Sequence, residues 1–419
     1  MVQKTVLDNG CRVITETLPH LVSVSLGIWV DNGSRDEGPA SSGISHFIEH
    51  MIFKGTRRRS AQQIALELDA VGGLSNAFTS KEQTCFHAKV LEDHLPRAAD
   101  LLLDIFTDSV FDPVELDRER QVVLQEISMV EDTPDEYTHV LYGETVYERN
   151  SLGQAILGTP ETVRSFTSEA LLRYLREAYG AEKVVVTAAG RVDHDALLAL
   201  LRPALEQLPP ARAESHRRKP ELSARLRVVS KDLEQVHLAL GTWAPAAADE
   251  NRYAATLLNA LTGGNMSSRL FQEVREKRGL AYTIYSYQSA FQDTGLWGIY
   301  TAVAPETLAE TLEVIGQELV KIKRGDLNRE ELEAAREFVR GGILLGAENS
   351  ENRMTRLAQN EIHFGRHLTF EEIMAGLQRT TLDDLAALAD QCLQPDIFSL
   401  VAFGPVRESD LPSPWMRWP

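Results

Sequence analysis

The sequence predicts an α+β protein of two homologous domains, each a mainly antiparallel sheet with helices packed on one face. Three observations support this fold class. The chain repeats itself at a constant spacing, strand-like and helix-like patterns alternate within each half, and a proline-rich charged segment separates the halves. With 419 residues and 43% hydrophobic content, the chain can form more than one packed core.

The internal repeat has an offset of 214 residues (236 minus 22). Three matches share it: "VSVSLGIWV" (22–30) with "VHLALGTWA" (236–244), "VVVTAAGRV" (184–192) with "FSLVAFGPV" (398–406), and Asp112 with Asp326. In the first match, Gly27 aligns with Gly241 and Trp29 aligns with Trp243. A constant offset at three distant places indicates two copies of one structural unit.

A linker is predicted between the two copies. The segment "PPARAESHRRKPE" has linker composition, because proline and charge replace apolar periodicity there. We therefore expect an N-terminal domain over residues 1–208, a linker over 209–221, and a homologous C-terminal domain over 222–419.

Within the first copy, local patterns predict the order of the elements. We expect strands over 5–15 and 22–30, a helix over 43–54, a helix opening at Ser60, strands within 74–90, and helices over 93–106 and 113–130. Ser60 and Gln63 form a capping-box pattern. Asp112 is the expected N-cap of the last helix, with Pro113 at its first position.

Composition argues against several classes of protein. No apolar run reaches the roughly 18 residues of a membrane-spanning helix, and the N-terminus lacks the apolar core of a secretory signal. A net charge of −18 argues against a nucleic-acid partner and suits cationic partners. The three cysteines are far apart and do not form a disulfide framework. We therefore expect a cytoplasmic protein with neither nucleic acid nor membrane as a partner.

The stretch "SHFIEHMIFKGT" (45–56) places His46 and His50 four residues apart, with Glu49 directly before the second histidine. On a helix, the two imidazoles project from one face about 6 Å apart, which suits two ligands of a tetrahedral Zn²⁺. Glu49 would lie beside them, within reach of a water at the metal. The alternative is a helix whose histidines make ordinary hydrogen bonds, and the full H-x-x-E-H order makes this alternative the weaker one.

The predicted helix 113–130 offers two candidates for a third ligand. Glu119 and Glu126 lie seven residues apart, two turns along one helix face and beside an apolar stripe. In the repeat, Glu126 aligns with Arg340, whereas Glu119 aligns with Glu333, and the histidines have no counterpart in the second copy. Because a metal site need exist only once, Glu126 is the better ligand. Glu119 is expected either to orient a histidine or to be structural.

These residues resemble a known family. The stretch "HFIEHMIFKGT", followed 76 positions after His50 by the last glutamate of "ERQVVLQEI", resembles the inverzincin metallopeptidases of the M16 type. The chain is most similar to the β-subunit-like group of mitochondrial processing peptidases and their bacterial relatives. The resemblance covers nearly the whole chain and includes "LDNGCRVITE", "NAFTSKEQTCF", "LGQAILGTPETV" and "MSSRLFQEVREKRGLAYTIYS".

The resemblance implies a set of metal-site roles. His46, His50 and Glu126 are expected to bind one Zn²⁺ per chain. Glu49 is expected to act as the general base of catalysis. Glu119 is expected to be the supporting carboxylate.

The resemblance also implies substrate contacts outside the metal site. Asn76 is expected to bind the substrate backbone near the scissile bond. Arg275 and Tyr282 are expected to hold the substrate carbonyl and to stabilise the tetrahedral intermediate. One departure from the family is "ERNSLG" (148–153), where many relatives have His-Pro before Leu-Gly.

We therefore expect a zinc-dependent endopeptidase that cleaves extended, unfolded peptides, including basic, presequence-like ones. The N-terminal domain (1–208) is expected to be the metal-binding catalytic domain, and the C-terminal domain (222–419) is expected to bind no metal and to complete the substrate chamber. The chain has both the metal set and the Arg275 and Tyr282 pair, so we expect a homodimer. One alternative is a catalytically inactive structural relative, like the core subunits of the respiratory bc1 complex. Another is a zinc-dependent peptide-binding module, which would need no base at Glu49.

Overall fold

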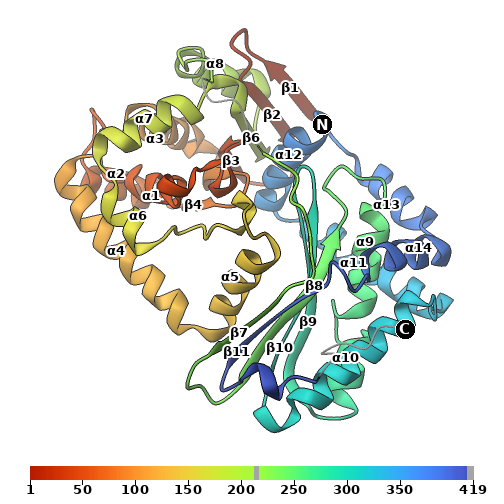
Figure 1. Cartoon of the computed structure of the whole chain (residues 1–419). Coiled ribbons are helices and arrows are strands. Elements are labelled where there is room, and N and C mark those ends of the chain that lie inside the picture. Colours follow the sequence, from red (N-terminus) through yellow and green to blue (C-terminus); the bar gives the residue numbers. More distant parts are fainter. Residues whose placement is uncertain (212–216, 413–419) are drawn as a thin grey trace. The chain divides into compact units, whose positions relative to one another are not determined.

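The computed structural model describes residues 1–211 and 217–412, drawn in Figure 1. The chain forms two compact units, and each is assembled from segments that are not contiguous in sequence. Unit 1 comprises residues 1–129, 154–211, 217 and 345–367, and unit 2 comprises residues 130–153, 218–344 and 368–412. Each unit contains one sheet and its own hydrophobic core.

The sheet of unit 1 has six strands in the order β1-β2-β6-β3-β5-β4. These strands are β1 (Val2–Val6), β2 (Arg12–Thr17), β3 (Ser23–Val30), β4 (Leu74–Thr79), β5 (Thr84–Leu91) and β6 (Val184–Gly190). Neighbours are antiparallel except β2 and β6, which run parallel. β3 and β6 are almost fully buried, whereas β4 is a largely exposed edge strand.

A layer of helices covers one face of this sheet and buries a continuous apolar core. The helices are α1 (Ile44–Met51), α2 (Ala61–Ala70), α3 (Leu95–Asp108), α4 (Pro113–Asp132), α6 (Pro160–Ser165), α7 (Ser168–Ala178) and α8 (His194–Leu205). The predicted caps are confirmed. Ser60 forms a capping box at the start of α2, and Asp112 accepts hydrogen bonds from the first amides of α4.

The sheet of unit 2 has five strands in the order β7-β11-β8-β10-β9. They are β7 (Leu226–Ser230), β8 (Val236–Ala244), β9 (Ala281–Ala290), β10 (Gly295–Val303) and β11 (Ser399–Gly404). Only β7 and β11 pair in parallel. The helices are α9 (Arg252–Thr262), α10 (Leu308–Lys323), α11 (Arg329–Gly346), α13 (Phe370–Arg379) and α14 (Leu382–Cys392). The predicted α+β class, with two sheets of mainly antiparallel strands, is confirmed.

Each sheet also has one helix on the face opposite its main helical layer. The sequence predicted helices on one face of each sheet, and so this second helix-covered face was not predicted. In unit 1 this helix is α12 (Ser350–Phe364), whose Met354 and Leu357 pack against Trp29. In unit 2 it is α5 (Pro134–Val146), whose Leu141 and Tyr142 pack against the far face of β8, β10 and β11. The two halves of the sequence thus exchange one helix each.

The repeated glycine makes room for these exchanged helices. A Cβ at Gly27 would lie 2.9 Å from the sulfur of Met354 on α12. A Cβ at Gly241 would lie 2.1 Å from the carbonyl of Trp297 on the neighbouring β10 and 2.7 Å from the hydroxyl of Tyr142 on α5. Real Cβ contacts are longer than any of these distances. The strongest match between the halves therefore marks where each sheet meets its exchanged helix.

The predicted linker 209–221 lies partly outside the described residues, because 212–216 are not described. Residues 209–211 and 217 belong to unit 1, whereas 218–221 belong to unit 2. The carbonyl of Pro209 accepts a hydrogen bond from the amide of Ala181, and Arg217 pairs with Asp31 and Asp36. The predicted domain boundary at this linker describes the sequence repeat and stays a prediction. The compact units do not follow it, because each contains segments from both sides of the linker. Within the described part of the chain, no helix is both long and apolar enough to cross a membrane.

Candidate metal centre and active site

Helix α1 presents the three residues of the H-x-x-E-H pattern on its more exposed face. Ile44, Phe47, Ile48 and Met51 turn into the core of unit 1, which fixes the rotation of the helix. His46, Glu49 and His50 are consequently left only partly buried. The rings of His46 and His50 lie 4.6 Å apart, centroid to centroid.

Helix α4 brings a carboxylate to the same place. Glu126 Oε2 lies 3.4 Å from His50 Nε2 and 3.7 Å from His46 Nε2. Within the described chain, these three side chains form the cluster of potential metal ligands, with ligand atoms all within 4.8 Å of one another. The structure thus brings together the three residues that the sequence singled out, from helices more than 60 residues apart.

This arrangement fits a zinc ion. A tetrahedral Zn²⁺ holds nitrogen and oxygen ligands at about 2.0–2.2 Å, which places neighbouring ligand atoms roughly 3.3–3.5 Å apart. The two histidine–carboxylate separations of 3.4 and 3.7 Å are close to that spacing. Two imidazoles with one carboxylate are also a donor set typical of catalytic zinc, which leaves one position open.

Glu119 approaches His50 from the other side of its ring. Its Oε1 lies 2.8 Å from His50 Nδ1, and its Oε2 accepts a hydrogen bond of 2.6 Å from Lys54. A proton held on Nδ1 by this carboxylate leaves the Nε2 lone pair facing Glu126. Glu119 therefore contacts a ligand candidate without joining the cluster itself. Among the described residues, His46 has no equivalent support, because none of them hydrogen-bonds to its buried Nδ1.

Electrostatics differ between the two histidines. Burial, together with a smaller contribution from the neighbouring His50, lowers the pKa of His46 to about 3. Burial also lowers the pKa of His50, but the hydrogen bond with Glu119 and the nearby carboxylates outweigh this and raise it overall. Burial raises the pKa of Glu119, yet hydrogen bonds from His50 and Lys54 lower it overall. His46 is thus neutral in the free protein, as a ligand must be.

Glu49 is fixed by a residue that the sequence did not suggest. The hydroxyl of Thr79, at the end of β4, donates a hydrogen bond of 2.6 Å to Glu49 Oε2. Burial raises the pKa of Glu49 above its ordinary value, although the Thr79 bond and His50 lower it. One carboxylate oxygen is therefore held in place while the group remains beside the two histidines.

A hollow of about 460 Å³ opens next to these residues. Glu49 and His50 form part of its wall. Apolar side chains such as Phe53, just after α1, and Leu68 on α2 form another part, and β4 contributes Asn76. Asn76 is exposed, and its side chain makes only a local hydrogen bond to the amide of Ala77. The predicted substrate residue Asn76 thus lies in the same hollow as Glu49.

The predicted pair Arg275 and Tyr282 lies in unit 2. Arg275 is on a π-helical turn (Phe271–Glu276), and its guanidinium lies 4.9 Å from the centre of the Tyr282 ring. Tyr282, near the start of β9, is 80% exposed. The half-buried Arg275 and the exposed Tyr282 therefore form one stacked pair within unit 2.

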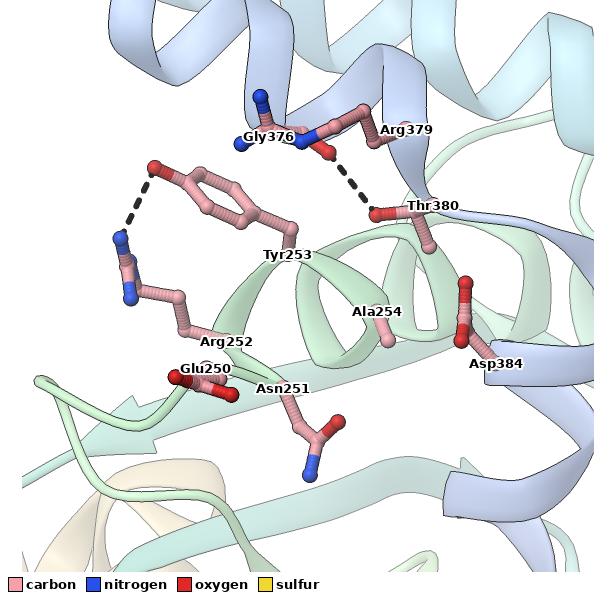
Figure 2. A pocket seen from close by; sticks show the side chains of 9 residues that line it. All are labelled: Glu250, Asn251, Arg252, Tyr253, Ala254, Gly376, Arg379, Thr380 and Asp384. Atoms are coloured by element: carbon pink, nitrogen blue, oxygen red, sulfur yellow. Dashed lines mark hydrogen bonds between the residues drawn. The ribbon is translucent and has the colours of Figure 1, made fainter.

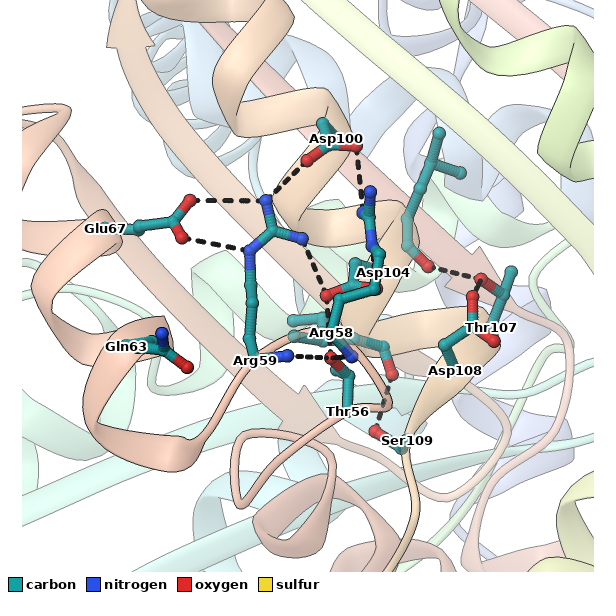
Figure 3. Close-up of polar contacts among 12 residues, drawn as sticks. Thr56, Arg58, Arg59, Gln63, Glu67, Asp100, Asp104, Thr107, Asp108 and Ser109 are labelled. Carbon is teal, nitrogen blue, oxygen red and sulfur yellow. Dashed lines mark hydrogen bonds and ion pairs between the residues drawn. The ribbon is translucent and has the colours of Figure 1, made fainter.

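The loop that follows α1 is held by a charged network, shown in Figure 3. Asp104 on α3 is fully buried and accepts hydrogen bonds from Thr56, Arg58 and Arg59. Arg59 also reaches Asp100. This network ties the loop between α1 and α2 to α3. Arg59 also pairs with Glu67 on α2, so the network helps to position a helix that carries part of the apolar wall of the hollow.

Figure 2 shows a second hollow, of about 410 Å³, within unit 2. It contains none of the predicted site residues. Its polar groups serve local structure: Asp384 accepts the amide of Thr381 at the start of α14, and Arg252 donates to the hydroxyl of Tyr253. We assign no function to it.

Sequence reasoning missed Lys54 and Thr79. Lys54 lies four residues after His50, a spacing that could have suggested a shared helix face. Thr79 had no such signal, because its contact with Glu49 depends on how α1 packs against β4.

Comparisons with known proteins identify the family of the chain. The profile described as insulinase, peptidase family M16, matches residues 12–160, and the profile described as peptidase M16 inactive domain matches residues 165–339. An uncharacterized zinc protease of Streptomyces coelicolor is 40% identical over 97% of this chain and 90% of its own length. Another, of Bacillus subtilis, is 39% identical over 97% of this chain and 98% of its own.

Among solved structures, a protease from Helicobacter pylori superposes with a TM-score of 0.90 at 23% identity, covering 96% of this chain and 99% of that one. At that identity, the structural match shows only that the fold is the same. The family profiles and the two relatives show the family as well, because the profiles match most of the sequence and the relatives are 40% and 39% identical to it. The chain belongs to peptidase family M16, the insulinase family.

Proposed function

We propose that this protein is a zinc-dependent endopeptidase with one Zn²⁺ per chain, held by His46, His50 and Glu126. The observation that carries the proposal is the convergence of these side chains, with Glu49 beside them, at a hollow edged by β4. The names of the relatives, which are zinc proteases, support the same choice of metal.

Each residue near the metal centre has a separate role in the proposed hydrolysis. A zinc ion held here supplies a Lewis acid that activates water and polarises a carbonyl oxygen. Glu49 acts as general base, taking the proton of the attacking water and passing it to the departing amine. Thr79 keeps one oxygen of Glu49 occupied, so the other is directed to the reaction. Glu119 orients His50 and stabilises its Nδ1 proton.

Substrates are extended, unfolded peptides. β4 is an edge strand paired on one side with β5, so an incoming peptide can add to its free edge by main-chain hydrogen bonds. Asn76 is exposed on this strand, beside Glu49. The net charge of −18 favours basic peptides, including presequence-like ones, through long-range attraction.

Arg275 and Tyr282 are proposed to hold the substrate carbonyl and stabilise the tetrahedral intermediate. Their stacking and the exposure of Tyr282 support this role, because an exposed aromatic hydroxyl backed by a cation is a good hydrogen-bond donor. The Tyr282→Phe variant should lower kcat while keeping zinc content and peptide affinity. Unchanged kcat would rule the role out.

The Glu49→Gln variant separates an enzyme from its two alternatives. An endopeptidase should lose turnover of a basic test peptide by several orders of magnitude while retaining zinc and peptide binding. If the protein is a zinc-dependent binding module or an inactive structural relative, the wild type itself should not hydrolyse the peptide. Unchanged hydrolysis in Glu49→Gln would contradict the mechanism.

We further propose that the protein acts as a homodimer, because one chain carries every proposed catalytic group. Sedimentation equilibrium of the active protein should give twice the chain mass of 46.7 kDa. A stable monomer with full activity would contradict this.

A further inference from the structure

Glu37 is a buried carboxyl group that the proposed mechanism does not use. It lies in the loop before α1 and is 4% exposed. Burial raises its pKa to about 8, although hydrogen bonds from Ser45 and Gly43 and the charge of Lys81 lower it. A carboxyl group so far from water is costly unless it is bound by specific donors. The buried Glu37 carboxyl group therefore requires donors that bind it.

Glu37 binds the first amides of the metal helix. Its Oε2 accepts a hydrogen bond of 2.6 Å from the amide of Gly43, and its Oε1 accepts one of 2.8 Å from the amide of Ser45. Gly43 is the N-cap of α1 and cannot cap it through a side chain. Glu37 thus satisfies amides that a helix N-terminus leaves free. One of them belongs to Ser45, the residue directly before His46.

A second segment holds the same helix end. It lies within "LGQAILGTPETV", a motif of the sequence to which the mechanism gives no role. The Thr162 hydroxyl donates a hydrogen bond of 2.7 Å to the carbonyl of Ser42. Gly158, at a φ of +75°, lies against the backbone of Ser42 and Gly43 so closely that a Cβ there would be 2.3 Å from the Ser42 carbonyl. Gln154 also donates to the carbonyl of Glu37.

These contacts hold only the start of α1. No described residue hydrogen-bonds to His46 Nδ1, so the ring of His46 depends on its backbone for its position. His50, one turn later, has Glu119 as an additional anchor. Any movement of the helix start would therefore displace His46 more than His50.

We infer that Glu37 is a positioning residue for the metal centre: by binding the amides of Gly43 and Ser45, it fixes His46 relative to His50 and Glu126. The inference rests on the proposed role of these three residues as ligands. It does not require that the protein hydrolyse any particular peptide. Metal binding can therefore test it separately from activity.

The test compares Glu37→Gln with a matched control. Glutamine keeps the side-chain size but places an NH₂ group against one of the two amides, so one hydrogen bond is lost. The control is Asp193→Ala, which removes a carboxylate cap from α8, a helix of the same unit that carries no ligand candidate. Both variants remove a helix cap, but only the first acts on α1.

We expect Glu37→Gln to weaken Zn²⁺ binding by about tenfold or more, on the scale seen when support of a ligand is lost. The visible spectrum of the Co²⁺-substituted protein should also change, because it reports the geometry of the ligands. Asp193→Ala should leave both within experimental error while lowering Tm. Wild-type affinity and spectrum in Glu37→Gln, or an equal loss in Asp193→Ala, would overturn the inference.

A second variant covers the case in which Glu37→Gln does not fold. Thr162→Val removes the hydrogen bond to Ser42, and with it the acceptor for the amide of Thr159 at the start of α6, with little change in volume. Weaker Zn²⁺ binding by a folded Thr162→Val protein would support the inference, and wild-type binding would overturn it. If the wild type binds Zn²⁺ and the variants bind it more weakly, but no peptide is cleaved, the proposed function fails while the inference stands.

Discussion

Replacing Glu119 with glutamine should weaken zinc binding while leaving the fold intact. Glu119 is 6% exposed, and its two oxygens lie 2.8 Å from His50 Nδ1 and 2.6 Å from Lys54 Nζ. Glutamine offers one acceptor oxygen, so its NH₂ group must face one of these two donors. Either orientation leaves Lys54 without its counter-ion, because glutamine is uncharged, and one of them also takes the acceptor away from His50.

The expected loss follows from these contacts. Removing the partner of a ligating histidine typically costs tenfold to hundredfold in metal affinity, which is about 1.4–2.7 kcal/mol. Lys54 would add repulsion of the metal in the variant. Because its side chain is 31% exposed, solvent screens this charge, and the total should stay within the same range.

A competitive titration of Zn²⁺ against a fluorescent chelator measures the change. The matched control is Glu115→Gln on the same helix, where the carboxylate pairs with Arg118, which is 69% exposed. Its zinc affinity should equal that of the wild type. Wild-type affinity in Glu119→Gln, or an equal loss in Glu115→Gln, would refute the reasoning.

Three further outcomes are expected. Thr79→Val should lower kcat by roughly tenfold or more with zinc content unchanged, because Glu49 loses the donor that orients it; steady-state kinetics with metal analysis checks this. Asp104→Ala should lower the free energy of unfolding by about 2–4 kcal/mol, because buried hydrogen-bond donors lose their acceptor. The control is Asp108→Ala, which breaks a pair with an exposed arginine and should cost at most about 0.5 kcal/mol in the same urea titration. Burial raises the pKa of Asp104, but hydrogen bonds from Arg59 and its neighbours lower it overall. Its contribution is therefore complete above the ordinary carboxyl pKa of 3.8 and is lost as pH falls through the lower folded value, so Asp104→Asn should show a shallower loss of stability below about pH 4.

Local patterns predicted the elements that local forces determine. Ser60 and Asp112 could be identified as helix caps because their hydrogen bonds reach only two or three residues along the chain. The four-residue spacing of His46 and His50 fixed their common face once the helix was assigned. The mismatch of Glu126 within the repeat predicted the carboxylate that the structure places beside both rings.

Contacts that depend on packing between distant elements could not be predicted in this way. The apolar faces of α5 and α12 show that each is buried, but not that each covers the sheet formed by the other half. Glu37 is six residues from Gly43 and carries no pattern that marks it as the anchor of α1. Its role depends on a loop that turns back on the helix start.

The zinc content of three purified proteins tests most directly whether His46, His50 and Glu126 form the metal centre. Wild type, Glu49→Gln and Glu126→Ala should be analysed together after dialysis against a weak chelator. We predict one zinc per chain in the first two and almost none in Glu126→Ala, with all three folded by circular dichroism. A full zinc complement in Glu126→Ala would show that the metal is held elsewhere.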